Sequence, residues 1–212
     1  MSVDEPRFER RAVDRFLYFS DAVAAIAITL LAIDLPAPRT ATASQLWSSV
    51  RQDSGHYLAF VVSFYVIAAS WSHHRDIFRY VERMDARLRT LGFFWLMTIV
   101  LIPFAARVVA VENGEHDVRF GFYAVLQVLV SGSMLVMARY AVAHDLVAPG
   151  APPPSRTDAD WQTYGLLLGF GLSIPIFFLT SYAWILWFAV PAGIGWTRRF
   201  RNRRPEPTEP DD

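Results

Sequence analysis

The stretch Gly165-Leu-Leu-Leu-Gly-Phe-Gly-Leu-Ser-Ile-Pro-Ile-Phe-Phe-Leu179 decides the fold class, because it has no polar face when it is wound as a helix. A helix of a soluble bundle keeps a polar face toward water, and a helix without one is buried in a protein core or in a membrane. Further apolar runs are spread along the whole chain. The sequence therefore predicts an all-α membrane protein rather than a soluble bundle.

The overall composition points to the same class. Hydrophobic residues make up 53% of the 212 residues, and the mean hydropathy is +0.25, which is too apolar for an ordinary soluble domain of this size. The chain contains no cysteine. A disulfide framework, a thiolate metal site and a cysteine nucleophile are therefore excluded.

Six segments approach the roughly 20 helical residues that cross a bilayer core. We expect a polytopic protein with six transmembrane helices at Phe16–Leu35, Gly55–Trp71, Leu91–Val111, Gly121–Ala141, Tyr164–Leu179 and Ala183–Trp196. Only Thr180, Ser181 and Tyr182 separate the last two, which indicates a tight helical hairpin. Residues 1–14 then form a cytoplasmic N-terminus, residues 15–197 the transmembrane domain, and residues 198–212 a basic, then acidic and proline-rich tail that we expect to be disordered.

The arginines predict the orientation, because cytoplasmic segments carry an excess of basic residues. All 20 basic residues are arginines, and a cytoplasmic N-terminus leaves outside only Arg39, Arg51, Arg107 and Arg119. We therefore expect a multi-pass protein of the inner (plasma) membrane with both termini in the cytoplasm. The proline-rich segment Ala148–Ser155 is then a cytoplasmic loop. Met1–Asp14 lacks a signal-peptide core, so the first apolar run is expected to stay as a membrane anchor.

Polar residues at membrane depth gather at the cytoplasmic ends of the first two predicted helices. Asp21 costs about 2.5–3.5 kcal/mol at the bilayer centre on insertion scales, so it should face protein or water. Arg15 lies about 240° around the same helix, so each of the two needs a partner elsewhere. The second helix ends with His73, His74 and Arg75. The simplest interpretation is a polar network that locks helix packing and contains Arg15, Ser20, Asp21, His73 and His74.

A proton relay is the sharper interpretation of the same cluster. A metal site is not expected, because two adjacent histidines point about 100° apart on a helix and do not chelate one ion. We interpret Trp71, like the other tryptophans and tyrosines near the predicted helix ends, as an interfacial anchor.

An apolar stripe follows Asp21 along the first predicted helix. Ile26, Thr29, Leu30 and Ile33 recur at the spacing of one helical face. Such a stripe is typical of a lipid-facing or core surface as well as of a pore lining. Asp34 follows at the outer end, where it either raises the cation concentration at a pore mouth or is a solvated loop residue.

Two sequence blocks resemble a known family. Arg15-x-x-x-Phe19-Ser20-Asp21, followed by Ala-Ile-Ala-Ile-Thr-Leu-Leu, is similar to the signature of the transmembrane protein 175 family, which comprises lysosomal and endosomal potassium channels and prokaryotic relatives. The block from Trp71 through His73, His74 and Arg75 to Arg79 resembles the prokaryotic branch, and Ile102-Pro103-Phe104 also fits. These motifs cover roughly Arg15 to Arg107. The last three segments match only in hydropathy and number.

The resemblance implies a homotetramer, since prokaryotic members carry one six-helix unit per chain and the first helix of each subunit lines a central pore. Counted from Asp21, the apolar constrictions fall at Ile26, Leu30 and Ile33, and a threonine layer falls at Thr29. The implied function is a weakly discriminating, potassium-selective cation channel. Permeant potassium is its ligand, and no resident cofactor is expected.

Two other function classes remain to be compared with the channel. A proton leak or proton-coupled transporter that uses Asp21 with His73 or His74 is the alternative. An intramembrane enzyme is not expected, because the chain has neither a lysine for a Ser–Lys pair nor a His-Glu-x-x-His motif. The expected partners are copies of the chain itself and the lipid bilayer, with no nucleic acid.

Overall fold

The structure is a computed structural model that describes residues 5–38, 42–110, 116–150, 158–177 and 185–201. These residues form the helices α1 (Glu5–Ile33), α2 (Ala43–Gln52), α3 (Ser54–Phe78), α4 (Ala86–Ala110), α5 (His116–Ala143), α6 (Asp158–Phe177) and α7 (Leu186–Arg201). Within the same residues, β pairing is limited to a single bridge between Val81 and Val147.

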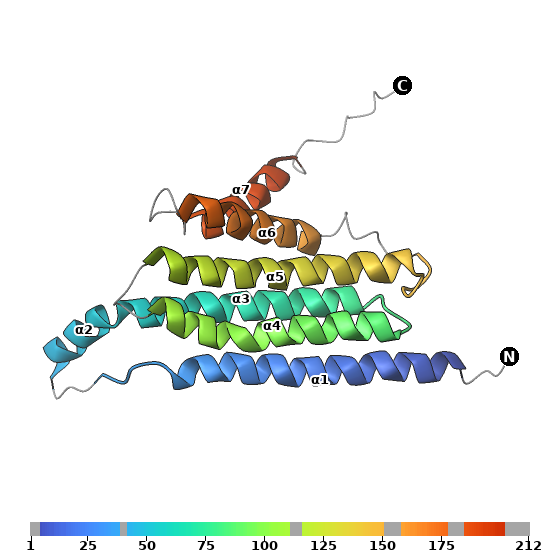
Figure 1. The fold of residues 1–212 in the computed structure, drawn as a ribbon, viewed down its shortest axis with the longest axis horizontal. Coiled ribbons are helices and arrows are strands. Elements are labelled where there is room, and N and C mark those ends of the chain that lie inside the picture. The colour runs from blue at the N-terminus through green and yellow to red at the C-terminus, as the bar shows by residue number, and fades with distance from the viewer. Residues whose placement is uncertain (1–4, 39–41, 111–115, 151–157, 178–184, 202–212) are drawn as a thin grey trace, which may run out of the picture.

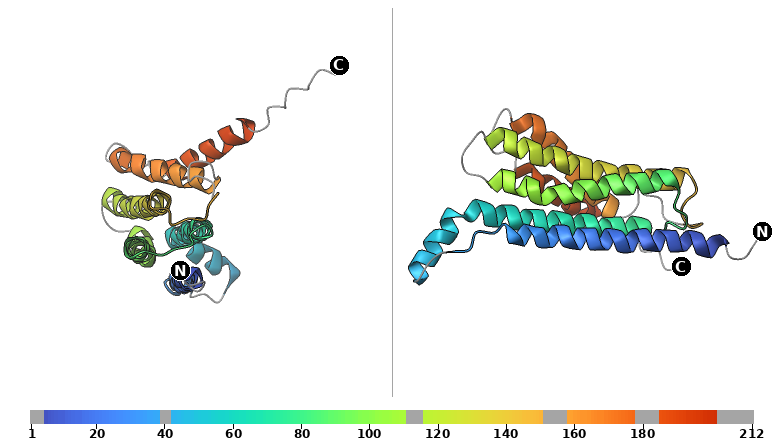
Figure 2. Two further views of the ribbon diagram at one scale, coloured as in Figure 1. Left: turned by 90° about the vertical axis from the view of Figure 1, so that its right-hand side faces the viewer. Right: turned by 60° about the horizontal axis from the view of Figure 1, so that its bottom comes forward.

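The long helices lie side by side along one axis (Figure 1, Figure 2). α1 packs against α3 and α4, α4 packs against α5, α5 packs against α6, and α6 packs against α7. α1 therefore lies at one edge of the bundle, and one of its sides is uncovered in the single chain (Figure 1). The short helix α2 projects beyond the bundle, and α7 turns away from the common axis (Figure 1).

Four helices of the described part of the chain are long and apolar enough to cross a membrane. They are the segments Arg10–Ile33, Ser54–Phe78, Ala86–Ala110 and Val118–Ala143. The fifth predicted segment corresponds to α6, whose apolar part Tyr164–Ile176 is shorter, and the sixth corresponds to α7. The prediction of an all-helical, multi-pass membrane protein is confirmed in this form.

The helix boundaries differ from the predicted ones where polar residues continue a helix. α1 begins at Glu5 and runs without a break across residue 15. Pro6 is tolerated because it lies in the first turn, where the missing N–H has no intrahelical partner. α2 was not predicted, because its 10 residues are too few to form an apolar run of membrane length. Its N-cap is Thr42. The predicted hairpin at Thr180–Tyr182 and residues 202–212 of the predicted tail lie outside the described residues. Residues 198–201, which were expected to be disordered, are instead the last turn of α7.

The densest part of the core surrounds α4. Trp95, Ile99 and Ile102 of this helix are fully buried. Gly92, one turn before Trp95, provides the room for α1 to approach, because a Cβ atom there would lie 2.3 Å from the ring of Phe16. The packing of α1 on α4 therefore depends on a glycine at this position.

Two loops hold the bundle together at the end where α1 begins. Residues 79–85 join α3 to α4, and residues 144–148 follow α5; we call the pair the loop clasp. The amide of Glu82 donates to the Leu146 carbonyl at 2.9 Å, and the amide of Ala148 donates to the Tyr80 carbonyl at 2.8 Å. We call this end of the bundle the clasp end, and the other end, where α1 reaches Asp34, the Asp34 end.

Candidate functional site

Asp21 joins α1 to α3 through both of its carboxylate oxygens. One oxygen accepts a hydrogen bond of 2.8 Å from the indole N–H of Trp71, and the other forms a 2.8 Å ion pair with Arg75. The two partners lie one turn apart on α3, so they face the same side. The guanidinium of Arg75 also lies 5.7 Å from the centre of the Trp71 ring. This arrangement satisfies a carboxylate that would be costly at membrane depth without partners.

The predicted five-residue network does not form. Trp71 and Arg75 bond to Asp21, and neither ring nitrogen of His74 has a hydrogen-bond partner among the described residues. The helical turn explains the difference, since residues 73 and 74 are rotated by about 200° and 300° from residue 71 whereas residue 75 is rotated by only about 40°. Arg15 is exposed and makes no hydrogen bond or ion pair within the described residues. The Ser20 hydroxyl donates to the Phe16 carbonyl of its own helix at 2.8 Å.

His74 belongs to a buried aromatic cluster instead. Its ring stacks on Trp95 of α4, with the ring centres 4.2 Å apart and the planes nearly parallel at 6°. The ring centre of Phe78 lies 4.4 Å from that of His74, and the ring centre of Phe16 of α1 lies at 6.0 Å. The cluster thus joins α1, α3 and α4 just beside the Asp21 contacts. Phe19 adds an edge contact to Phe93 with a ring-centre distance of 5.9 Å.

The apolar stripe of α1 lies on the uncovered side of that helix. Ile26 is 59% exposed, Leu30 40% and Ile33 76%. Thr29 is exposed on the same face, and its hydroxyl donates to the Ile26 carbonyl at 2.9 Å, so its oxygen lone pairs remain available. Ala24, Ala27 and Leu31 are buried on the opposite face. The stripe is therefore not a core surface, and no other helix of the described residues covers it.

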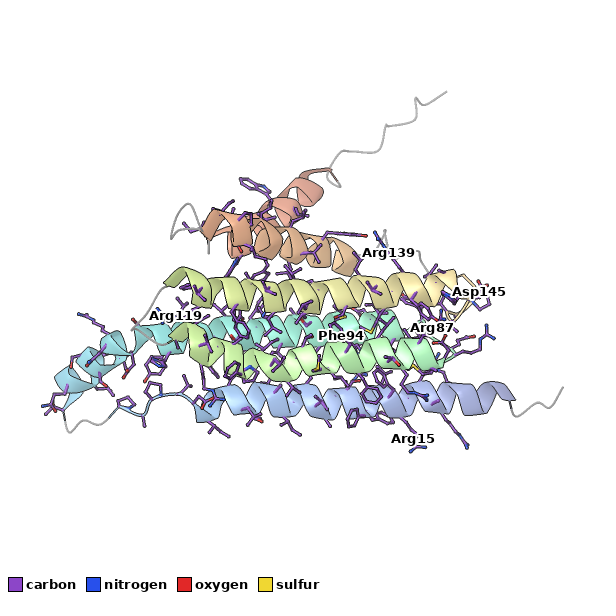
Figure 3. The ribbon with its side chains drawn as sticks, viewed as in Figure 1. Arg15, Arg87, Phe94, Arg119, Arg139 and Asp145 are labelled. Carbon is purple, nitrogen blue, oxygen red and sulfur yellow. The ribbon has the colours of Figure 1, made fainter. Side chains whose placement is uncertain are left out.

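Arg15 shares the exposed side of α1 with the stripe, nearer to the clasp end. Figure 3 shows its side chain pointing away from the other helices. At the opposite end of α1, Asp34 forms an ion pair with Arg107 of α4, with N···O distances of 3.3 and 3.4 Å. The negative charge that the sequence placed at a possible pore mouth is thus partly neutralised.

Among the described residues, no group of three or more histidine, aspartate or glutamate side chains is placed to hold a metal ion. A titratable side chain with a shifted pKa lies in the loop clasp, outside the membrane-length helices. Burial alone would raise the pKa of Asp85. Hydrogen bonds from the Tyr140 hydroxyl and the Leu88 amide, together with the nearby His144 and Arg87, lower this pKa below its usual value.

Comparison with known proteins links these features to a family. Residues 15–103 match the family model described as endosomal/lysosomal potassium channel TMEM175. The chain is 39% identical over 116 residues to a potassium channel of Streptomyces collinus, and this match covers 53% of the chain and 56% of that channel. It is 28% identical over 190 residues to a potassium channel of Chamaesiphon minutus, which covers 86% of the chain and 90% of that channel. The chain thus spans about half of the first relative and most of the second.

A solved structure extends the likeness to nearly the whole chain. The crystal structure of a lysosomal potassium-selective channel TMEM175 homolog from Chamaesiphon minutus has a TM-score of 0.68, at 23% identity, and covers 92% of this chain and 100% of its own. At this identity the likeness shows a shared fold. The sequence match contains the Phe19-Ser20-Asp21 motif and its partners on α3, so the chain is similar to the TMEM175 family over residues 15–103.

Proposed function

We propose that four copies of this chain form a potassium-selective cation channel whose central pore is lined by α1. The observation that carries this proposal is the stripe of Ile26, Leu30 and Ile33, which is exposed on a helix at the edge of the bundle. The family match and the relatives named potassium channels support it. In a tetramer, the uncovered side of α1 faces the other three copies.

A ring of isoleucine and leucine side chains discriminates between cations through dehydration. Apolar side chains do not replace the water around an ion, so a narrow ring penalises the strongly hydrated sodium ion more than potassium. Thr29 adds hydroxyl oxygens between the apolar rings. Their lone pairs are available to a cation, because the hydroxyl hydrogen is already donated to the Ile26 carbonyl. Selectivity in this arrangement is moderate, and the ring also gates by dewetting.

The proposed assembly has six membrane crossings per chain in the plasma membrane, with both termini in the cytoplasm. The four long apolar helices supply the first four crossings, and α6 and α7 supply the other two. The arginine distribution supports this orientation, since only Arg39, Arg51, Arg107 and Arg119 lie outside. The clasp end is then cytoplasmic, and Asp34 lies at the outer mouth.

The alternative of a proton leak through Asp21 is less favoured by the contacts. A proton carrier exchanges protons with water or with a neighbouring titratable group, whereas both oxygens of Asp21 are bonded to Trp71 and Arg75. His74, one of the two proposed relay partners, is stacked in the aromatic cluster. Asp21 is therefore better suited to hold α1 against α3.

Flux through reconstituted liposomes tests the proposal. The protein should pass potassium down a gradient faster than sodium. Ile26→Asn should leave the oligomer intact, raise the flux and lower the discrimination against sodium, because a polar ring eases cation dehydration. Proton flux measured in the same liposomes separates the channel from the proton leak. Absence of potassium flux, with proton flux retained, would contradict the proposal.

Leu31→Met is the matched control for Ile26→Asn. Leu31 is 4% exposed on the opposite face of α1, and methionine conserves its volume. This change should leave the selectivity unaltered. If Leu31→Met altered selectivity while Ile26→Asn did not, the pore-lining face of α1 would be wrongly assigned.

A further inference from the structure

A cavity opens between α3, α4, α5 and α7 in the half of the bundle near the Asp34 end. Its volume is about 270 Å³. Leu58 and Val62 of α3, Val109 of α4, Phe120 of α5 and Trp187 of α7 form its apolar wall. No residue of α1 is among the described residues that line the cavity, so it is separate from the proposed pore.

The polar groups of the cavity are already satisfied. The hydroxyls of Ser63 and Tyr123 are hydrogen-bonded to each other at 3.0 Å, and both residues are almost fully buried. A cavity with so few available polar partners does not retain water, and apolar cavities of about 150 Å³ are known to bind benzene. The apolar wall therefore favours a hydrocarbon as the ligand of this cavity.

Two arginines lie near cavity-lining residues in the sequence and suggest the kind of hydrocarbon. The cavity extends along α3 from Gly55 to Ser63, a rise of about 12 Å. Arg51 lies in the last turn of α2, just before Gly55, and Arg119 immediately precedes Phe120. Figure 3 shows Arg119 at this same end of the bundle. Cationic residues at the same end of the bundle as an apolar cavity of this depth complement a phosphate group attached to an acyl chain.

We propose that this cavity binds one acyl chain of a phospholipid from the leaflet at the Asp34 end, with the phosphate near Arg51 and Arg119. The assignment of that leaflet as the outer one rests on the orientation given under the proposed function. The binding itself does not, because the cavity is formed within one chain and does not require ion conduction.

Photo-crosslinking in liposomes tests the proposal with the full-length protein. The probe is a phosphatidylcholine that carries a diazirine in the middle of one acyl chain, added at increasing mole fraction. Labelled peptides from the cavity wall should saturate at a low mole fraction. Labelling around Leu129, which is 43% exposed on α5, reports ordinary contact with bulk lipid and should rise in proportion to the probe.

Two variants fill the cavity from different helices. Val62→Trp and Val109→Phe should each lower labelling of the cavity wall about tenfold, as expected when room for about two methylene groups is lost. Leu129→Phe is the matched control and should leave it unchanged. Each variant must elute as an intact oligomer before its labelling is compared. If only one of the two filling variants does so, that variant alone tests the proposal. Cavity labelling that rises linearly with the probe, or that survives filling, would overturn the proposal.

A competition experiment tests the position of the phosphate. Unlabelled phosphatidylcholine should compete with the probe at the cavity wall more strongly than a diacylglycerol with the same acyl chains, because only the former carries a phosphate. Equal competition by the two lipids would overturn the contact with Arg51 and Arg119.

Discussion

Asp21 connects α1 to α3 through the contacts of its own side chain. Trp71 and Arg75 are the residues of α3 that face it, each at 2.8 Å. The Asp21 side chain is 26% exposed and that of Arg75 50%, so water weakens the ion pair only in part. A hydrogen bond to a charged group contributes about 1.5–3 kcal/mol, which is more than an exposed ion pair contributes.

Asp21→Asn should therefore destabilise the folded protein by about 1–3 kcal/mol, since Arg75 loses its counter-charge. Thermal unfolding in detergent measures the loss. The matched control is Asp76→Asn, which removes the exposed i,i+3 pair with Arg79 and should cost less than about 0.5 kcal/mol. Equal losses in both variants would show that Asp21 is no more than a surface charge.

Gly92→Ala should be destabilising although alanine favours helices. Its Cβ atom would lie 2.3 Å from the Phe16 ring, so Phe16 or α1 must move, and such overpacking costs about 1–3 kcal/mol. Gly121→Ala in α5 meets no atom within 4 Å and should be neutral or stabilising by up to about 1 kcal/mol. Thermal unfolding of the two variants gives the comparison, and a stabilising Gly92→Ala would contradict the packing of Phe16 on α4.

Single residues were predictable from the sequence where helical spacing alone determines their direction. The spacing placed Ile26, Leu30 and Ile33 on one face of α1, and the structure shows that this face is exposed. Trp71 was interpreted as an interfacial anchor, because hydropathy does not reveal that its indole N–H meets Asp21. The role of Gly92 depends on the position of another helix, which the local sequence does not contain.

The packing of α4 and α5 at the clasp end depends on the loop clasp as well as on apolar contacts. Asp85 is its central side chain, because it accepts hydrogen bonds from the Leu88 amide at the start of α4 at 2.7 Å and from the Tyr140 hydroxyl of α5. One carboxylate therefore caps α4 and joins it to the end of α5. The nearby Arg83 guanidinium donates to the Asp145 carbonyl at 2.7 Å and adds a second connection between the loops.

The contribution of Asp85 to stability should depend on pH. Its pKa in the folded protein is lowered from 3.8, so its stabilising effect is complete above the unfolded pKa and is lost as the pH falls through the folded pKa. Asp85→Ala should therefore cost about 1–2 kcal/mol at pH 7, and the difference from the unchanged protein should shrink below about pH 4.

Thermal unfolding at pH 7 and at pH 3 measures this dependence. Glu82→Ala is the control, because Glu82 is an exposed acid of the same loop and should have little effect at either pH. A loss from Asp85→Ala that is equally large at both values would indicate that the capping geometry matters and the charge does not.

Helices were predictable from the sequence when they contain a long apolar run. The segments that became α1, α3, α4 and α5 were identified by their hydropathy, and their centres agree with the structure. Their ends were missed where charged turns continue the helix, as at Glu5 of α1 and Phe78 of α3. The loop clasp was not predicted, because residues 79–85 and 144–148 are far apart in the sequence and pair mainly through backbone atoms.

At the scale of the whole molecule, the bundle is asymmetric. α4 and α5 lie inside it, and half of the membrane-length window of each is buried, against 28% for α1 and 22% for α3. α1 is the first helix of the chain and lies at one edge of the bundle (Figure 2). A helix with an exposed apolar stripe in this place is suited to contact further copies of the chain around a pore, which the sequence indicated only through the family resemblance.

The orientation of the bundle in the membrane provides a test at this scale. The segment around Asn113 connects α4 to α5 and so follows the Asp34 end of α4, whereas Pro152 follows the clasp end of α5. The chain has no cysteine, so a single introduced cysteine reports its own side of the membrane.

The arginine excess at the clasp end predicts that a membrane-impermeant maleimide added to intact cells labels Asn113→Cys, whereas Pro152→Cys reacts only after the cells are opened. Leu129→Cys, in the middle of α5, should resist labelling from both sides. The reverse pattern at the two loop positions would place Asp21 and the loop clasp outside the cell and Asp34 in the cytoplasm.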